Sequence, residues 1–110
     1  MVAIPSYNGR VFPRFEHAEE FHLAQVCLSR ATVTTIDVVT FDGCGDIGAW
    51  LCRQNVKVVL CSGINQRQQI LLQQAGIKLR WGFSGEVNAV LQQWLQVNNS
   101  GSSQAQDVAL

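Results

Sequence analysis

The feature that most constrains the fold is a nearly continuous apolar run in the middle of the chain, VKVVLC at Val56–Cys61. Apolar residues without regular polar alternation are typical of a strand that is buried on both faces of a parallel sheet. Parallel strands cannot be joined by a tight turn and need a crossover, which is usually a helix. The run therefore predicts an α/β domain with a helix before this strand and another after it.

The segments on both sides of the run carry helix signals. Asp46 is favourably placed in a first helical turn, and apolar residues follow it at helical spacing over 47–51. Beyond the run, Asn65 and Gln68 have the spacing of a capping box, in which the two side chains satisfy each other's free backbone N–H groups. Gly76 suits the left-handed position that ends a helix. We therefore expect one helix from about Asp46 and a second from Asn65 to Gly76.

The chain then offers a last strand and a last helix. Residues 77–81, IKLRW, form a short strand-like segment, and Ser84 is a good N-cap for the helix that follows. Five apolar residues in that helix are separated by steps of three and one, which places them all on one face: Val87, Val90, Leu91, Trp94 and Leu95. This face is the predicted contact of the helix with the core.

The first part of the chain reads as strands. Val2–Ile4 is a short apolar segment that Pro5 is expected to end, and Asn8-Gly9 is a turn signal. The segments 21–27 and 32–41 are partly alternating or rich in β-branched residues, and we expect them to form an antiparallel pair. Together with the second half of the chain, this order predicts a mixed α/β sandwich.

Length and composition limit the domain organisation and the partners. The chain has 110 residues and is 47% hydrophobic, which is enough for one core. We expect a single domain over 1–96 and a mobile tail over 97–110, because the tail is polar and rich in small residues. The formal net charge is zero, which argues against nucleic acid as a partner. The sequence shows no signal peptide or membrane-spanning run, so a cytoplasmic location is expected.

The four cysteines must be judged by their positions. They form no CxxC pair, so a disulfide framework and a spacing-based zinc site are both disfavoured. Cys44 lies in a glycine turn before a predicted helix, where it is either a thiolate available to a metal or a small side chain in a tight turn. Cys61 ends the buried strand and is more often a small core residue there. Cys27 and Cys52 are interpreted as core or helix-face residues.

Two of these cysteines occupy loops where α/β proteins bind ligands. Ligands of open α/β sheets lie beyond the carboxyl ends of the parallel strands, where loops lead into helices. The loops that hold Cys44 and Cys61 are therefore predicted to be neighbours, with the backbone amides of two helix starts facing one pocket that favours an anion.

A second candidate region lies in the loop RVFPRFEHAEEF at 10–21. Arg14 could bind an anion there, and His17 could act as a metal ligand or a proton donor. The alternative is a solvated loop that its phenylalanines attach to the core. Enzyme signatures are missing: the sequence contains no GxSxG, no P-loop and no dinucleotide glycine motif. A thiol enzyme based on Cys61 and His17 has no support from spacing, so we expect a protein that is not an enzyme.

Four segments, taken in order, resemble the dinitrogenase iron-molybdenum cofactor biosynthesis family. They are VAIPSYNGRVFPRFEHAEEF, FDGCGDIGAWL, VKVVLCSGINQRQQILLQQAGIKLRW and SGEVNAVLQQWL, and they extend over about residues 2 to 96. The resemblance implies a ribonuclease H-like three-layer sandwich with a mixed, mainly parallel-cored sheet of about five strands and about three helices. It also implies a role in nitrogen fixation-related cofactor chemistry.

The resemblance further implies a non-catalytic carrier of an anionic metal–sulfur cluster, such as the iron-molybdenum cofactor or its precursor, with cluster-assembly or acceptor proteins as partners. Carried over to this chain, the ligand region comprises Arg14, His17, Gly43, Cys44, Gly45, Cys61, Ser62 and Gly63. Cys44 and His17 are the expected direct metal ligands. The stretch around Asp42 has no histidine where members of the family often carry one. This difference favours an alternative, a metal-free accessory or regulatory interaction module of the same fold.

Overall fold

The computed structural model describes residues 1–41, 43 and 46–99. Within these residues, six strands form one mixed sheet: β1 (Val2–Tyr7), β2 (Arg10–Val11), β3 (Glu20–Cys27), β4 (Thr32–Thr40), β5 (Val58–Leu60) and β6 (Lys78–Arg80). The helices are α1 (Ile47–Arg53), α2 (Gln66–Gln74) and α3 (Val87–Asn99), and two short 3₁₀ turns are η1 (Phe15–His17) and η2 (Leu28–Arg30). None of the helices in this part of the chain is long and apolar enough to cross a membrane.

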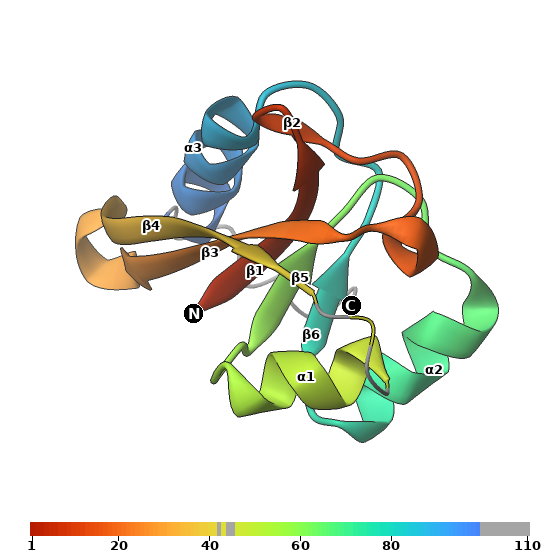
Figure 1. Cartoon of the computed structure of the whole chain (residues 1–110). Coiled ribbons are helices and arrows are strands. Elements are labelled where there is room, and N and C mark those ends of the chain that lie inside the picture. The colour runs from red at the N-terminus through yellow and green to blue at the C-terminus, as the bar shows by residue number, and fades with distance from the viewer. Residues whose placement is uncertain (42, 44–45, 100–110) are drawn as a thin grey trace.

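The sheet has the strand order β4-β3-β1-β5-β6, with the short β2 added to the end of β1 (Figure 1). β1 runs parallel to β5, and β5 runs parallel to β6. β3 is antiparallel to both β1 and β4, which confirms the predicted antiparallel pair. The prediction of a mixed α/β sandwich is therefore confirmed. β2 is an addition, a two-residue partner of β1 that follows the Asn8-Gly9 turn.

Helices cover both faces of the sheet and make three layers. Figure 1 shows α1 and α2 together on one side of the sheet and α3 on the other. Successive residues of a strand point to opposite faces, so Ala3 packs with the cluster under α1 and α2, whereas Val2 and Ile4 pack with the cluster under α3. The predicted core face of α3 is confirmed, because all five of its apolar residues are buried.

The sequence had indicated that Pro5 ends the first strand, and this prediction is wrong. β1 continues to Tyr7, and Pro5 lies opposite Phe21 in the ladder with β3. The carbonyl of Pro5 accepts a hydrogen bond from Phe12 N (2.9 Å), on the side away from β3. The N–H that proline lacks would point to that same side, where the ladder with β5 has already ended at Ala3. The ladder with β3 therefore loses no hydrogen bond at Pro5.

The start of α3 also differs from the prediction. The helix begins at Val87, so Ser84 is not its N-cap. Gly85 has a positive φ of 96°, and Glu86 forms an isolated antiparallel bridge with Arg10. These two conformations keep the chain extended for longer than the local sequence indicates. At its other end the helix extends to Asn99, beyond the domain boundary expected at residue 96.

Candidate functional site

Two loops that are far apart in sequence join at one end of the sheet. The loop after β5 contacts the segment that leads into η1 through two backbone hydrogen bonds, from Gly63 N to Pro13 O (2.9 Å) and from Phe15 N to Gly63 O (2.9 Å). Arg14 and Gly63 form a parallel bridge at this junction. The early loop is thus held against the carboxyl end of β5, where ligands of α/β sheets bind.

A groove opens between the starts of α1 and α2, beside this junction. It has a volume of about 510 Å³, and its lining consists of Glu16, Phe41, Asp46, Ile47, Asn65, Arg67, Gln68 and Leu71. These residues come from η1, from both helix starts and from the end of the β4 to α1 connection. The prediction that the two strand-to-helix connections are neighbours is therefore confirmed for the described residues at the two helix starts.

Three of the backbone donors at these helix starts have partners within the chain. Ala49 N donates to Asp46 Oδ2 (3.2 Å), and Gln68 N donates to Asn65 Oδ1 (2.8 Å). Asn65 N donates to Glu16 Oε1 (3.1 Å), so Glu16 takes the position that the predicted capping box assigned to the Gln68 side chain. Side chains at N-caps stabilise helices in this way. An anion at these amides would have to replace groups of the protein itself.

The charges of the groove are mixed. Glu16 and Asp46 contribute carboxylates, and Arg67 contributes a guanidinium. The side-chain oxygen Oε1 of Gln68 is buried in the wall and has no hydrogen-bond partner within the described part of the chain. The predicted preference of the pocket for anions therefore has weak electrostatic support, because two negative groups face the groove and one positive group opposes them.

Cys61 is a core residue. Its side chain is fully buried among the residues under α1 and α2, and its backbone pairs with Arg80 and Phe83. Burial, with a smaller contribution from the charge of Glu16, raises the pKa of the Cys61 thiol to about 12. A buried neutral thiol is neither a nucleophile nor an accessible ligand. This position agrees with the core residue that the sequence offered as one alternative, and the place of Cys61 among the binding residues stays a prediction.

Ser62 and Gly63 shape the junction. The Ser62 carbonyl accepts a hydrogen bond from Gly82 N (3.0 Å). A Cβ atom at Gly63 would lie 2.8 Å from the carbonyl oxygen of Pro13, which is closer than real contacts allow. Glycine is therefore required at position 63 by the close approach of two backbones, and these two residues hold the loops in place.

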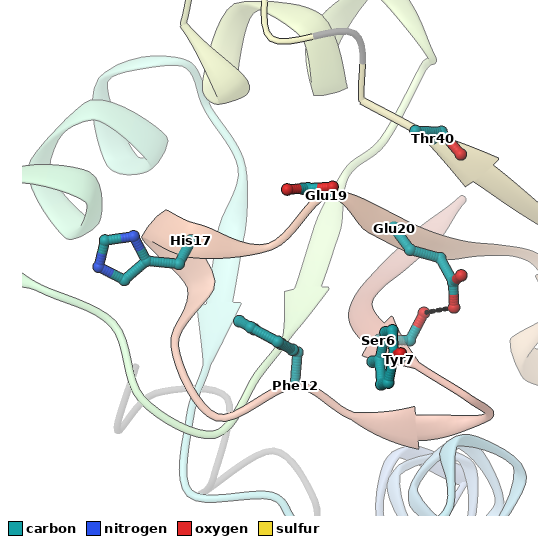
Figure 2. A pocket seen from close by; sticks show the side chains of 7 residues that line it. All are labelled: Ser6, Tyr7, Phe12, His17, Glu19, Glu20 and Thr40. Atoms are coloured by element: carbon teal, nitrogen blue, oxygen red, sulfur yellow. Dashed lines mark hydrogen bonds between the residues drawn. The ribbon is translucent and has the colours of Figure 1, made fainter.

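Arg14 and His17 lie outside the groove. Both side chains are exposed, and they line a shallow apolar depression with Phe12 and Pro13. Figure 2 shows the His17 ring pointing away from Ser6 and Glu20, although all three residues line one pocket. Of the three residues in η1, Glu16 is the one that lines the groove. Sequence reasoning missed Glu16, because nothing in the local pattern links it to Asn65.

The glycine turn before α1 is only partly described. Gly43 is exposed and has a positive φ of 80°. Cys44 and Gly45, which the sequence assigns to the ligand region, lie outside the described residues. Over residues 1–41, 43 and 46–99, no three His, Cys, Asp or Glu side chains are grouped so that they could hold a metal ion.

A second pocket, of about 270 Å³, lies on the other side of η1 (Figure 2). Ser6 in its wall is 1% exposed and forms hydrogen bonds with two residues of β3. Its hydroxyl lies 2.7 Å from His22 Nδ1 and donates to Glu20 Oε2 (3.3 Å). Burial lowers the pKa of His22, and the charge of Glu20 opposes this shift in part. Ser6 is thus a satisfied buried polar residue, and the sequence pattern contained no signal for it.

Solved structures share this fold. The protein PH0822 has a TM-score of 0.79 at 23% identity, over 86% of this chain and 88% of its own. A crystal structure from Methanocaldococcus jannaschii, provisionally assigned as a dinitrogenase, has a TM-score of 0.74 at 17% identity, over 90% of each chain. A Thermotoga protein, provisionally assigned as NifB, has a TM-score of 0.66 at 22% identity, over 86% of each chain.

At these identities the solved structures establish the fold alone, and no curated protein is significantly similar in sequence. The profile of the family described as dinitrogenase iron-molybdenum cofactor matches residues 1–97. This match includes every strand, α1, α2 and most of α3, and it agrees with the four segments on which the resemblance rests. The chain therefore belongs to the dinitrogenase iron-molybdenum cofactor family.

Proposed function

We propose that this protein carries an anionic metal–sulfur cluster of the iron-molybdenum cofactor type, or a precursor of it, as cargo and does not catalyse a reaction. The observation that carries the proposal is that residues flanking the three predicted ligand segments, Glu16, Asp46 and Asn65, line one groove between α1 and α2. Cargo would pass between this groove and cluster-assembly or acceptor proteins.

The charges of the groove define how the cargo would be held. Because Glu16 and Asp46 both face the groove, attraction by charge contributes little, and a direct metal–sulfur bond must supply the affinity. Cys44 comes between the groove residues Phe41 and Asp46 in the sequence, and we propose its thiolate as the ligand. His17, which lines the depression outside the groove, is the weaker candidate.

Anaerobic reconstitution tests this proposal. The protein is incubated with iron, molybdate and sulfide, desalted, and examined by metal analysis and absorbance spectroscopy. The wild type should retain metal, and Cys44→Ala should lose most of it. Cys52→Ala is the matched control, because it also removes one thiol, from an exposed position on α1 that does not line the groove. Equal retention by Cys44→Ala and the wild type, or no retention by the wild type, would contradict the proposal.

A second candidate is a metal-free accessory or regulatory module that contacts a protein partner. It is favoured by the caps, because Asp46, Asn65 and Glu16 occupy three of the backbone donors that an anion could use. Purification from the native host without oxygen distinguishes the two functions. A stable, metal-free protein complex would support the module, whereas a coloured, metal-loaded monomer would count against it.

A further inference from the structure

The outer edge of β4 is long and unprotected. β4 is the terminal strand of the sheet order, and its only strand partner among the described elements is β3. Eight of its nine residues are β-branched, Asp37 is its only charge, and most of its side chains are exposed. Edge strands are normally protected by lysine, proline or short length, because their free backbone groups pair with other strands. Among the residues that the structure describes, the charge of Asp37 and the register shift beside Thr34 are the protections of this edge.

The register of β3 and β4 shows which backbone groups face outward. Phe41 N donates to Glu19 O (2.7 Å), so Phe41 faces β3. The register stays regular from this point back to Thr35, and hydrogen-bonded positions alternate along an antiparallel pair. Ile36, Val38 and Thr40 therefore direct their N–H and C=O groups away from β3. Three donors and three acceptors line the free edge.

Two of the same positions carry apolar side chains that are exposed. Val38 is 58% exposed and Ile36 is 39% exposed. The regular stretch ends at Thr34, where the register shifts by one residue and this threonine has no ladder partner in β3, although its hydroxyl donates to Gln25 O (3.0 Å). Such a shift bends a strand and disturbs further pairing. The surface available for pairing is therefore the segment from Thr35 to Thr40.

We propose that this edge pairs with the same edge of a second copy of the chain, antiparallel and centred on Val38. Val38 then lies opposite Val38 of the second copy, and Ile36 lies opposite Thr40 of the second copy. Each of these pairs joins residues whose backbone groups face outward, so the hydrogen-bond patterns match. A two-fold axis makes one strand complementary to itself, which is why a second copy fits this edge.

The charge of Asp37 and the irregularity at Thr34 favour this register over its neighbours. Centring the pair on Asp37 would place two carboxylates directly opposite each other, and like charges in this position are destabilising. Centring on Ile36 would place the Thr34 irregularity opposite Val38. Centring on Val38 places Asp37 opposite Val39 of the second copy and avoids both conflicts.

The size of the surface determines how strong the dimer is. The paired segment of five residues, Ile36 to Thr40, extends for about 17 Å, and a strip of that length buries far less than the roughly 1,200 Å² of a standard stable interface. The dimer is therefore weak and depends on concentration.

Two methods test this inference: sedimentation equilibrium and amide hydrogen exchange. Each is followed over protein concentrations from about 10 μM to about 1 mM, the range expected for the dissociation of a weak complex. The average mass should rise from that of one chain toward that of two. Exchange of the Ile36, Val38 and Thr40 amides should slow at least about tenfold at high concentration, as these amides become hydrogen-bonded. The Val39 amide, which faces β3, should be protected at every concentration and serves as the internal reference.

Val38→Lys places two ammonium groups opposite each other on the axis and should remain monomeric throughout. Thr32→Lys adds the same charge to an exposed residue of β4 outside the paired segment and should dimerise like the wild type. Circular dichroism confirms that both variants fold. A wild type that stays monomeric overturns the proposal and leaves the edge to a strand of another protein. A dimer that survives Val38→Lys overturns it as well.

Discussion

The contact between Gly63 and Pro13 offers the most direct test of how the site is built. Gly63 lacks a positive φ, so alanine at this position meets no backbone penalty. The obstacle is steric, because its Cβ would lie 2.8 Å from the Pro13 carbonyl oxygen. That oxygen also accepts the hydrogen bond from Gly63 N. Gly63→Ala should therefore push the early loop away from the end of β5.

The size of the stability loss follows from two destabilising contributions and one stabilising contribution. Overpacking typically costs about 1–3 kcal/mol, and weakening the two hydrogen bonds at the junction adds up to about 1 kcal/mol each. Alanine also restricts the unfolded chain, which returns about 0.4–1 kcal/mol. Together these terms give a net loss in the free energy of unfolding that is centred on about 2 kcal/mol and extends to about 5 kcal/mol, and a loss of about 2 kcal/mol lowers the melting temperature of a domain of this size by roughly 8–16 °C.

Thermal and urea unfolding measure the loss in the free energy of unfolding. Hydrogen exchange of the Phe15 amide measures local opening of the junction between the two loops, since this amide donates to Gly63 O. Gly43→Ala is the control, because Gly43 has a positive φ and no atom within 4 Å of an added Cβ. It should lower stability by about 1–2 kcal/mol through backbone strain alone and leave the Phe15 amide protected. A Gly63→Ala protein with wild-type stability and a protected Phe15 amide would refute the steric argument.

Three further predictions concern titrating groups near the two pockets. Glu16→Ala should lower the free energy of unfolding by about 1 kcal/mol in urea denaturation, because Asn65 N loses its acceptor, whereas Glu16→Gln should retain most of the stability. The Cys61 pKa is raised from 9.0 to about 12, so the contribution of this thiol to stability should be constant below pH 9.0 and fall as the pH rises through this window, and Cys61→Ala should lack that decline. The His22 pKa is lowered from 6.5, so the unfolded chain takes up a proton first and stability should fall as the pH drops below 6.5. Denaturation of His22→Gln, which should lack this component, tests the last assignment.

Local signals in the sequence were enough to predict the helices and most strands. Asn65 caps α2 as expected, Asp46 lies at the start of α1 as its N-cap where a place in the first turn was expected, and Gly76 follows α2 with a positive φ of 80°. The five apolar residues of α3 all face the core. These predictions succeeded because capping and periodicity depend on groups within about one helical turn of each other.

The site depended on contacts that no local pattern contains. Glu16 reaches Asn65 across 49 positions of sequence, and Gly63 is required only because another backbone passes within contact distance. The sequence left open whether Cys61 is a ligand or a core residue, and its complete burial decided for the core. The burial of a strand end depends on which loops cover it.

By itself, then, the sequence determined the family, the mixed α/β class and the spacing of the helices, since each follows from residues close to one another in the chain. The tertiary structure decided where the groove lies, which residue of η1 faces it, and which backbone groups of β4 remain free. Those features arise from the packing of segments that are distant in sequence. Their energies depend on register and close approach, which sequence periodicity does not encode.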